Sequence, residues 1–174
     1  IWSKTYDENF ALNNNYKSPQ NIVKYFKQYS NIGDFPILDV GAGTGLVGEY
    51  LKKYCSSIIH ALDISNDMLN IAKQKECYEK IIVADLNKKL LISDNTYGAI
   101  LSAGTFTHGH VGPNALRELL RITKPGGLFV ISIHEEIFAK KGFKEELKKI
   151  GNKISQINYH RVNVYGKTKK SIKR

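Results

Sequence analysis

The sequence is poor in cysteine and methionine: its 174 residues include two Cys and one Met. Cys55 and Cys77 are too few for a disulfide framework, and neither lies near a partner at metal-ligand spacing. We therefore expect two reduced cysteines, as in a cytoplasmic protein, and no metal site.

Long hydrophobic runs are also missing. No apolar stretch approaches the roughly 18 residues that span a bilayer, and the chain does not open with the pattern of a signal peptide. It begins with Ile1 rather than Met, so a preceding segment is not excluded. Hydrophobic residues make up 42% and charged residues 24%, which is typical of a globular protein without a membrane segment.

Arginine is scarce, although the net charge is +10: the 26 basic residues are 22 Lys and four Arg. Arginine is the residue that base and phosphate recognition favours. The lysines are scattered, with denser stretches at 140–149, where Glu145 and Glu146 interrupt them, and at 167–174. These stretches are typical of a solvated helix face and a basic tail, so we do not expect a nucleic acid as partner.

Strand-like and helix-like segments alternate along the chain. Short apolar runs predict strands at about 36–40, 57–62, 80–84, 97–102 and 128–133. Helices are expected from Ser18–Pro19, at about 44–54, from Ser65 or Asn66 to Ala72, and at about 114–123 and 136–150. Two last strand-like runs, about 153–158 and 161–166, are close enough to pair antiparallel. This order predicts an α/β fold with a doubly wound, mostly parallel seven-stranded sheet and a C-terminal antiparallel hairpin.

The most informative segment is 37–45, Ile-Leu-Asp-Val-Gly-Ala-Gly-Thr-Gly. An apolar run ends in three glycines at alternate positions, and helix-forming residues resume at Leu46. A strand, a tight turn and a helix start bring a nucleotide-like ligand against the backbone. Asp39, just before the glycines, would repel a pyrophosphate and attract a cation. S-adenosylmethionine (SAM) has an ammonium group, a sulfonium and no phosphate.

A dinucleotide site is an alternative. Residues 43–48 also match G-x-G-x-x-G, and Asp63 follows about 20 residues later, as a dinucleotide site requires. A glycine turn that binds nothing is the third possibility.

Two further carboxylates follow the next two predicted strands. Asp63 ends the second strand, where its two oxygens could accept hydrogen bonds from both ribose hydroxyls of an adenosine, although a helix N-cap is the simpler role. Asp85 ends the third strand, where it could accept from the adenine amino group while the Leu86 amide donates to the ring. A dinucleotide site leaves Asp85 without an obvious role.

With these motifs in this order, the chain resembles the class I SAM-dependent methyltransferases over about residues 2–166. Residues 39–45 match the family's first motif, Asp63 its ribose-binding acid, Asp85 its adenine-side acid, and 123–128 the turn before its fifth strand. The resemblance implies a Rossmann-like fold, SAM as cofactor and S-adenosylhomocysteine as product. The cofactor-binding residues that it implies are Tyr6, Asp39, Gly41, Ala42, Gly43, Gly45, Asp63, Ile64, Met68, Asp85, Leu86, Ser102, Ala103 and Gly104.

A narrower resemblance comes from residues 104–111 and 116–121. Together with the opening 2–7, they are similar to the Williams–Beuren syndrome region methyltransferase-like group (methyltransferase-like protein 27). We expect residues 1–174 to form a single methyltransferase domain, with a helical lid at 1–30, a SAM-binding core at 31–166 and a basic tail at 167–174.

Methyl transfer from a sulfonium is an in-line displacement with a neutral leaving group, so the protein chiefly aligns the reactants. If a base is used, the candidates are His108 and His110 in the loop after the fourth strand. His134 and Glu135 could also reach an acceptor. Tyr6 is the candidate cap over the methionine end of the cofactor.

Little sequence is inserted between the fifth strand and the predicted hairpin, where substrate-specific elements would lie. We therefore expect transfer to a small-molecule acceptor, with a pocket partly open to a macromolecule as the alternative. Two alternatives remain at this point. One is a non-catalytic SAM-binding module. The other is a nicotinamide-dependent oxidoreductase, although residues 102–111 offer no Tyr-Lys proton-donor pair.

Overall fold

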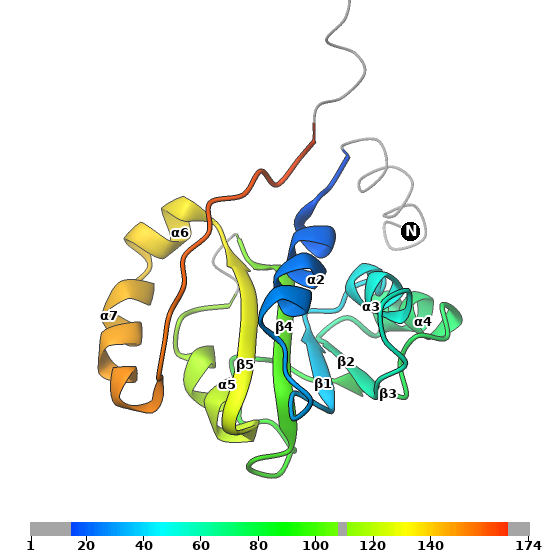
Figure 1. Ribbon diagram of the computed structural model, residues 1–174, viewed down its shortest axis with the longest axis horizontal. Coiled ribbons are helices and arrows are strands. Elements are labelled where there is room, and N and C mark those ends of the chain that lie inside the picture. The colour runs from blue at the N-terminus through cyan, green and yellow to red at the C-terminus, as the bar shows by residue number, and fades with distance from the viewer. Residues whose placement is uncertain (1–14, 108–110, 167–174) are drawn as a thin grey trace, which may run out of the picture.

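The computed structural model describes residues 15–107 and 111–166, and a parallel sheet lies at its centre (Figure 1). The sheet has five strands in the order β3-β2-β1-β4-β5, and every neighbouring pair is parallel. The strands are β1 (Ile37–Val40), β2 (Ile59–Asp63), β3 (Lys80–Val83), β4 (Tyr97–Phe106) and β5 (Thr123–Ile133). The predicted parallel, doubly wound α/β fold is therefore confirmed.

Helices cover both faces of the sheet, which explains why its strands are apolar on both sides. One face packs against α2 (Ser18–Tyr29), α3 (Leu46–Lys52) and α4 (Asn66–Gln74). The other packs against α5 (Ala115–Ile122), α6 (Glu135–Lys140) and α7 (Phe143–Lys149). Successive residues of β1 serve the two cores in turn: Ile37 belongs to the first, and Leu38 and Val40 to the second.

The strand order reverses between β1 and β4, because the chain first moves outward from β1 to β2 and β3 and then returns to β4. Ligands of open α/β sheets bind outside the carboxyl ends of the strands at such a point. The fold therefore places the glycine turn after β1, the end of β2 and the end of β4 around one location.

The predicted sixth and seventh strands, and the hairpin between them, are wrong for the described residues. Gly151–Lys153 is a 3₁₀ helix, and up to Gly166 the chain makes one isolated bridge, between Tyr16 and Tyr165. Nearby, the Lys17 amide donates to the Val164 carbonyl at 2.7 Å. The residues between the two runs, 159–160, are Tyr and His, which rarely take the positive φ that a two-residue hairpin needs. The extended chain pairs instead with the segment before α2.

Three predicted boundaries also differ. The helix expected at 136–150 is two helices, α6 and α7, because Gly142 takes φ +80° between them. The turn expected at 124–127 is a bulge inside β5: Tyr97 pairs with Thr123, and Ala99 already pairs with Leu128. The pair Ser18–Pro19 predicts Ser18 as the N-cap of its helix, but Ser18 lies in the first turn of α2 and the N-cap is Lys17.

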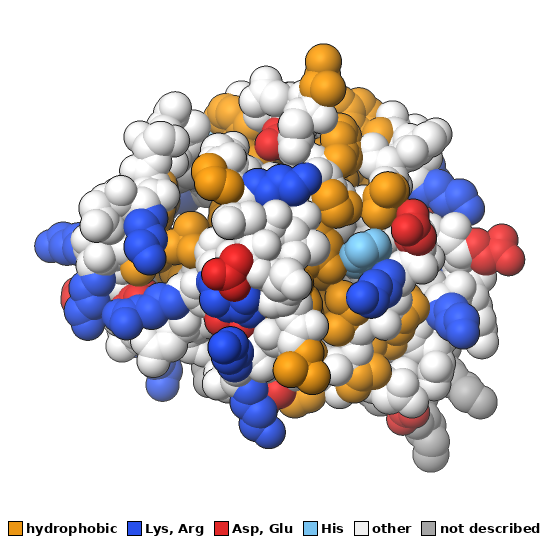
Figure 2. Space-filling model, turned by 90° about the horizontal axis from the view of Figure 1, so that it is seen from below, with side chains coloured by type: hydrophobic (Ala, Val, Ile, Leu, Met, Phe, Trp, Pro, Cys, Tyr) orange, Lys and Arg blue, Asp and Glu red, His pale blue; other side chains and the backbone are white. Residues whose placement is uncertain are grey.

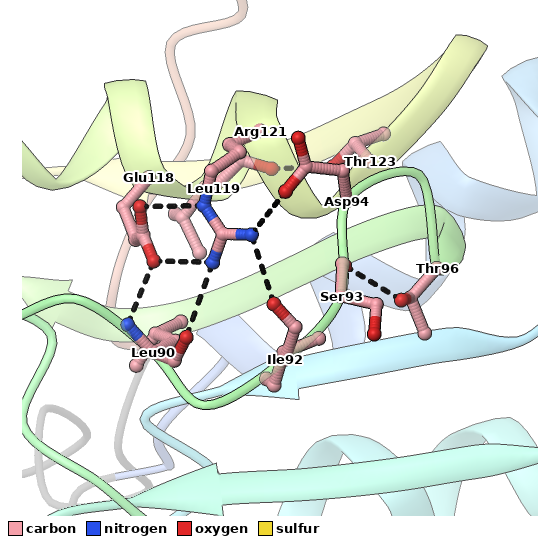
Figure 3. Close-up of polar contacts among 9 residues, drawn as sticks. All are labelled: Leu90, Ile92, Ser93, Asp94, Thr96, Glu118, Leu119, Arg121 and Thr123. Atoms are coloured by element: carbon pink, nitrogen blue, oxygen red, sulfur yellow. Dashed lines mark hydrogen bonds and ion pairs between the residues drawn. The ribbon is translucent and has the colours of Figure 1, made fainter.

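Arg121 on α5 fixes the irregular segment that leads into β4 (Figure 3). Its guanidinium donates to the carboxylates of Glu118 and Asp94 and to the carbonyls of Leu90 and Ile92. The hydrogen bonds to Glu118 and Asp94 raise the pKa of Arg121 further above its ordinary value. The contacts tie residues 90–94 to the helix that precedes β5.

The face formed by the amino ends of the strands, opposite the glycine turn, is seen in Figure 2. Lys and Arg side chains stand singly or in small groups, and Asp and Glu side chains lie among them. Hydrophobic side chains occupy much of the remainder of this face. This face therefore presents mixed charge rather than the continuous basic surface that nucleic-acid binding requires.

Candidate cofactor site

The turn between β1 and α3 is held in one shape by its own backbone. Gly41, Gly43 and Gly45 have φ values of +68°, +54° and +89°, which only glycine adopts without strain. The amides of Gly41 and Ala42 donate to the Leu62 carbonyl at 2.7 and 3.0 Å, so the turn is also anchored to β2. The alternate glycines of the sequence thus serve the backbone geometry of the turn.

The end of β4 supports the turn from the other side. The Ser102 hydroxyl donates to the Val40 carbonyl at 2.7 Å, and the Thr105 hydroxyl donates to the same carbonyl at 3.0 Å. The two hydroxyls are 2.9 Å apart. Ser102 is fully buried, so its role is to join β4 to β1 beneath the site.

Asp63 lies at the end of β2 with both carboxylate oxygens directed at backbone amides. Its Oδ2 accepts from the Gly43 amide at 2.8 Å, and its Oδ1 accepts from the Ser65 amide at 2.8 Å. Helix α4 is capped separately, because the Ser65 hydroxyl accepts from the Met68 amide at 3.3 Å. Each oxygen of Asp63 retains a second lone pair, which is what two ribose hydroxyls would need.

Asp39 is fully buried under the glycine turn. Its Oδ2 accepts a hydrogen bond from the Tyr78 hydroxyl at 2.6 Å, whereas its Oδ1 is buried and finds no hydrogen-bond partner among the described residues. Burial raises the pKa of Asp39 to about 7; the Tyr78 hydrogen bond opposes this shift, and the negative charge of Asp63 adds to it. A buried carboxylate with an unpaired oxygen favours a cationic or donating group beside it.

Among the described residues, Asp85, which follows β3, makes its hydrogen bonds and its ion pair with residues of its own loop rather than with the glycine turn. The Asp85 Oδ1 accepts from the amide and the side-chain nitrogen of Asn87, at 2.9 and 3.1 Å, and its Oδ2 lies 3.9 Å from Lys88 Nζ. The Leu86 side chain is buried in the core, so only its backbone could face a ligand. Ile64 is 68% exposed beside Asp63.

A groove of about 2690 Å³ begins at the glycine turn and continues along β5 to the C-terminal segment. The cofactor residues expected from the sequence that line it are Gly41, Ala42, Gly43, Asp63, Met68, Ala103 and Gly104. Those in the described part of the chain that do not line it are Asp39, Gly45, Ile64, Asp85, Leu86 and Ser102. His134 and Glu135 line the groove farther along. Tyr6, His108 and His110 lie outside the described residues.

Three residues of the site were missed by sequence reasoning: Tyr16, Tyr78 and Thr105. Tyr16 lines the groove, and its hydroxyl occupies the space that a β-carbon on Gly104 would need. Burial raises the pKa of Tyr16, so its hydroxyl stays protonated as a donor. Tyr78 and Thr105 touch the glycine turn from below and from β4. No local pattern marks these residues, because each approaches the turn from a distant part of the chain.

The residues present fit SAM better than a dinucleotide. Asp39 and Asp63 put two carboxylates at one glycine turn, and their mutual repulsion is relieved by positive charge and increased by a pyrophosphate. In residues 15–107 and 111–166, no three His, Cys, Asp or Glu side chains gather as a metal site. None of the helices described by the structure is long and apolar enough to cross a bilayer.

The sheet order, the glycine turn and the carboxylates at the strand ends define a Rossmann-like methyltransferase fold of class I. The methyltransferase domain family matches residues 38–131, and this chain belongs to that family. SAM is the methyl donor that the family implies.

Three known proteins illustrate the similarity. Human methyltransferase-like protein 27 is 37% identical over 97 residues, which are 55% of this chain and 39% of that protein. The malonyl-[acyl-carrier protein] O-methyltransferase 2 of Ilyobacter polytropus is 32% identical over 134 residues, 75% of this chain and 49% of that protein. The TehB-like SAM-dependent methyltransferase of Corynebacterium glutamicum has a similar fold, with a TM-score of 0.60 and 23% identity over 76% of this chain and 71% of that chain.

The match to human methyltransferase-like protein 27 confirms the narrower resemblance that residues 104–111 and 116–121 indicated. The chain spans less than half the length of the two curated relatives.

Proposed function

We propose that this domain transfers a methyl group from SAM to a small-molecule acceptor bound in the groove. The observation that carries the proposal is the pair of carboxylates, Asp39 and Asp63, at a glycine turn where none of the described residues fills the space above Gly43. The charges favour a cationic ligand, and the turn gives that ligand a backbone surface to lie against.

When bound, SAM supplies an electrophilic methyl group on sulfur. Asp63 would accept from the ribose hydroxyls, because its Oδ2 already faces the turn at Gly43 and each of its oxygens retains a second lone pair. Gly104 lies near the end of β4 and under the Tyr16 hydroxyl. In this proposal the acceptor approaches the glycine turn from the side of Gly104. Proximity and alignment account for most of the rate in such a displacement, and a rigid turn supplies both.

The acceptor would occupy the part of the groove beyond Gly104. A drug-sized ligand needs roughly 300–1,000 Å³; the groove of about 2690 Å³ exceeds this, and it also extends past Gly126 to Asn95 at the amino ends of the strands. Tyr16 and His134 line this part; Tyr16 could donate to an acceptor oxygen, and His134 could accept a proton. His108 and His110 remain proposed bases on sequence grounds.

The small-molecule acceptor has one further support. The Ilyobacter polytropus relative is named for O-methylation of malonyl groups on a carrier protein, a small acid presented by a larger partner. A groove that stays open along β5 suits an acceptor of that size, free or carried. The N-terminal segment before α2, from which Tyr16 comes, would then act as the lid of the site.

Calorimetric titration with SAM, S-adenosylhomocysteine, NAD and NADP tests the cofactor. We expect SAM and S-adenosylhomocysteine to bind and the two nicotinamide cofactors not to bind. A ligand present at 100 times its dissociation constant should raise the free energy of unfolding by about 2.7 kcal/mol. Binding of NAD alone would restore the oxidoreductase alternative.

Radiolabelled SAM incubated with panels of small acids, amines, phenols and thiols then tests transfer. Incorporation of label into one chemical class supports catalysis. Tight SAM binding without transfer to any panel, while a known methyltransferase labels its substrate in parallel, would favour the non-catalytic binding module.

A further inference from the structure

Tyr78 lies directly under the glycine turn, between the end of α4 and the start of β3. Its ring occupies the space that β-carbons on Gly45 and Gly48 would need, so the first turn of α3 rests on the aromatic ring. Its hydroxyl accepts from the Gly48 amide at 3.0 Å and donates to Asp39 Oδ2 at 2.6 Å. One side chain thus contacts the strand before the turn and the helix after it.

The hydrogen bond to Asp39 matters for the charge of that carboxylate, because within residues 15–107 and 111–166 Tyr78 is the hydrogen-bond partner found for it. Burial of an ionised carboxylate is costly unless donors compensate. The short distance is typical of a hydrogen bond between a hydroxyl and a carboxylate oxygen that bears charge. Tyr78 therefore lowers the cost of the charged form of Asp39 beneath the site.

We propose that Tyr78 is a positioning residue for the cofactor: its hydroxyl favours the charged form of the Asp39 carboxylate and its ring fixes α3 under the glycine turn, so that SAM affinity depends on Tyr78. The inference rests on the proposed function, since it takes SAM as the ligand. Tyr78 lies outside the glycine motif, and in this proposal it determines how tightly the motif binds SAM.

Because Asp39 is ionisable, the proposed role of Tyr78 predicts that SAM affinity depends on pH. The ionisable groups facing the carboxylate are Tyr78, Asp63 on β2 and the Cys77 thiol. Burial and Asp63 raise the pKa of Asp39 to about 7, and the Tyr78 hydrogen bond holds that pKa down. Burial raises the pKa of Tyr78 well above its ordinary value, and Asp39 adds to this shift, so Tyr78 remains a donor throughout.

The test compares Tyr78→Phe with the wild-type protein by SAM titration between about pH 5.5 and 8.5. Wild-type affinity should rise as pH passes through about 7, because a cationic ligand prefers ionised Asp39. In Tyr78→Phe, affinity at pH 7 should fall about tenfold or more, since a charge-assisted hydrogen bond is lost. The midpoint of the pH profile should also move upward, because the carboxylate loses its donor.

Tyr97→Phe is the matched control. Tyr97 is also buried, but its hydroxyl lies 2.9 Å from His60 Nδ1, a residue of β2 away from the glycine turn. This variant should keep the wild-type affinity and midpoint.

Three outcomes would overturn the inference. If folded Tyr78→Phe keeps the SAM affinity and the pH midpoint of the wild type, the role of Tyr78 is rejected and the proposed function stands. If the wild-type protein does not bind SAM, the proposed function is rejected as well. If Tyr78→Phe does not fold, the same titration is done with Asp39→Asn. The SAM affinity of this variant should be lower than that of the wild type and constant across this pH range. A pH profile like that of the wild type would reject the inference.

Discussion

The Thr105 hydroxyl occupies the space that a β-carbon on Gly41 would need. Thr105 reaches this position because β4 continues to Phe106 and its hydroxyl donates to the Val40 carbonyl. The first glycine of the motif is therefore required by the packing of β4 against the turn. Gly43 differs, since no atom of the part of the chain that the structure describes lies within 4 Å of the position of its β-carbon, and the residue lines the groove.

Substitution of these two glycines should separate packing from binding. Gly41→Ala should destabilise the fold by about 3 kcal/mol, from backbone strain and collision with Thr105. Gly43→Ala should cost about 1 kcal/mol of stability through strain alone and still abolish SAM binding, because the methyl group enters the groove. Urea denaturation and SAM titration measure the two effects. Equal stability of the two variants would contradict this account of Gly41.

Asp63→Ala should abolish SAM binding while the protein stays folded. The variant removes the proposed ribose acceptor and the acceptor of the Gly43 and Ser65 amides, so a stability loss of about 1–3 kcal/mol is also expected. The matched control is Asp67→Ala, an exposed residue in the first turn of α4. Calorimetry with SAM and circular dichroism decide the result. Retained affinity in folded Asp63→Ala would reject the ribose assignment.

Asp39 should make the stability of the ligand-free protein depend on pH. Its pKa is raised from 3.8 to about 7 on folding, so the folded state holds a proton that the unfolded chain has released. The resulting stabilisation is fully present below the unfolded pKa and is lost as pH rises to the folded pKa. Between these two pKa values the contribution of Asp39 to the free energy of unfolding changes by about 4 kcal/mol in total, and above the folded-state pKa this contribution is constant.

Denaturation of the wild-type protein and Asp39→Asn at several pH values between 4 and 8 measures this contribution as a difference. The wild type should lose stability relative to the variant as pH rises to about 7. A difference that does not change with pH would show that Asp39 keeps an ordinary pKa.

Arg121→Lys should lower stability clearly more than the control variant below and leave SAM affinity unchanged. A lysine cannot reproduce the planar set of donors that bind two carboxylates and two carbonyls (Figure 3). Arg161→Lys is the control, because its ion pair with Glu135 joins side chains that are 91% and 74% exposed and should contribute less than about 1 kcal/mol. Urea denaturation compares the two. A similar loss in both variants would contradict the structural role of Arg121.

Local patterns predicted the centre of the sheet well. The apolar runs before Gly41 and Asp63 correspond to β1 and β2, and Ser65 caps α4 as expected. Buried parallel strands and capped helices are determined by nearby residues, so short windows identify them. The same windows failed at the C-terminus. Alternating residues at 161–166 allow a strand, but a strand forms only where another supplies hydrogen bonds, and here the partner is the segment around Tyr16.

The order of Asp39, the glycines, Asp63 and Asp85 along the chain was enough to indicate the fold, the family and the cofactor, because parallel strands necessarily bring their carboxyl ends to one edge. The contacts that hold this edge required the folded structure. Tyr78 meets Asp39 and Thr105 meets Val40 across separations of 39 and 65 residues. Such pairs arise from the packing of helices and strands onto one another, and no spacing within the sequence specifies them.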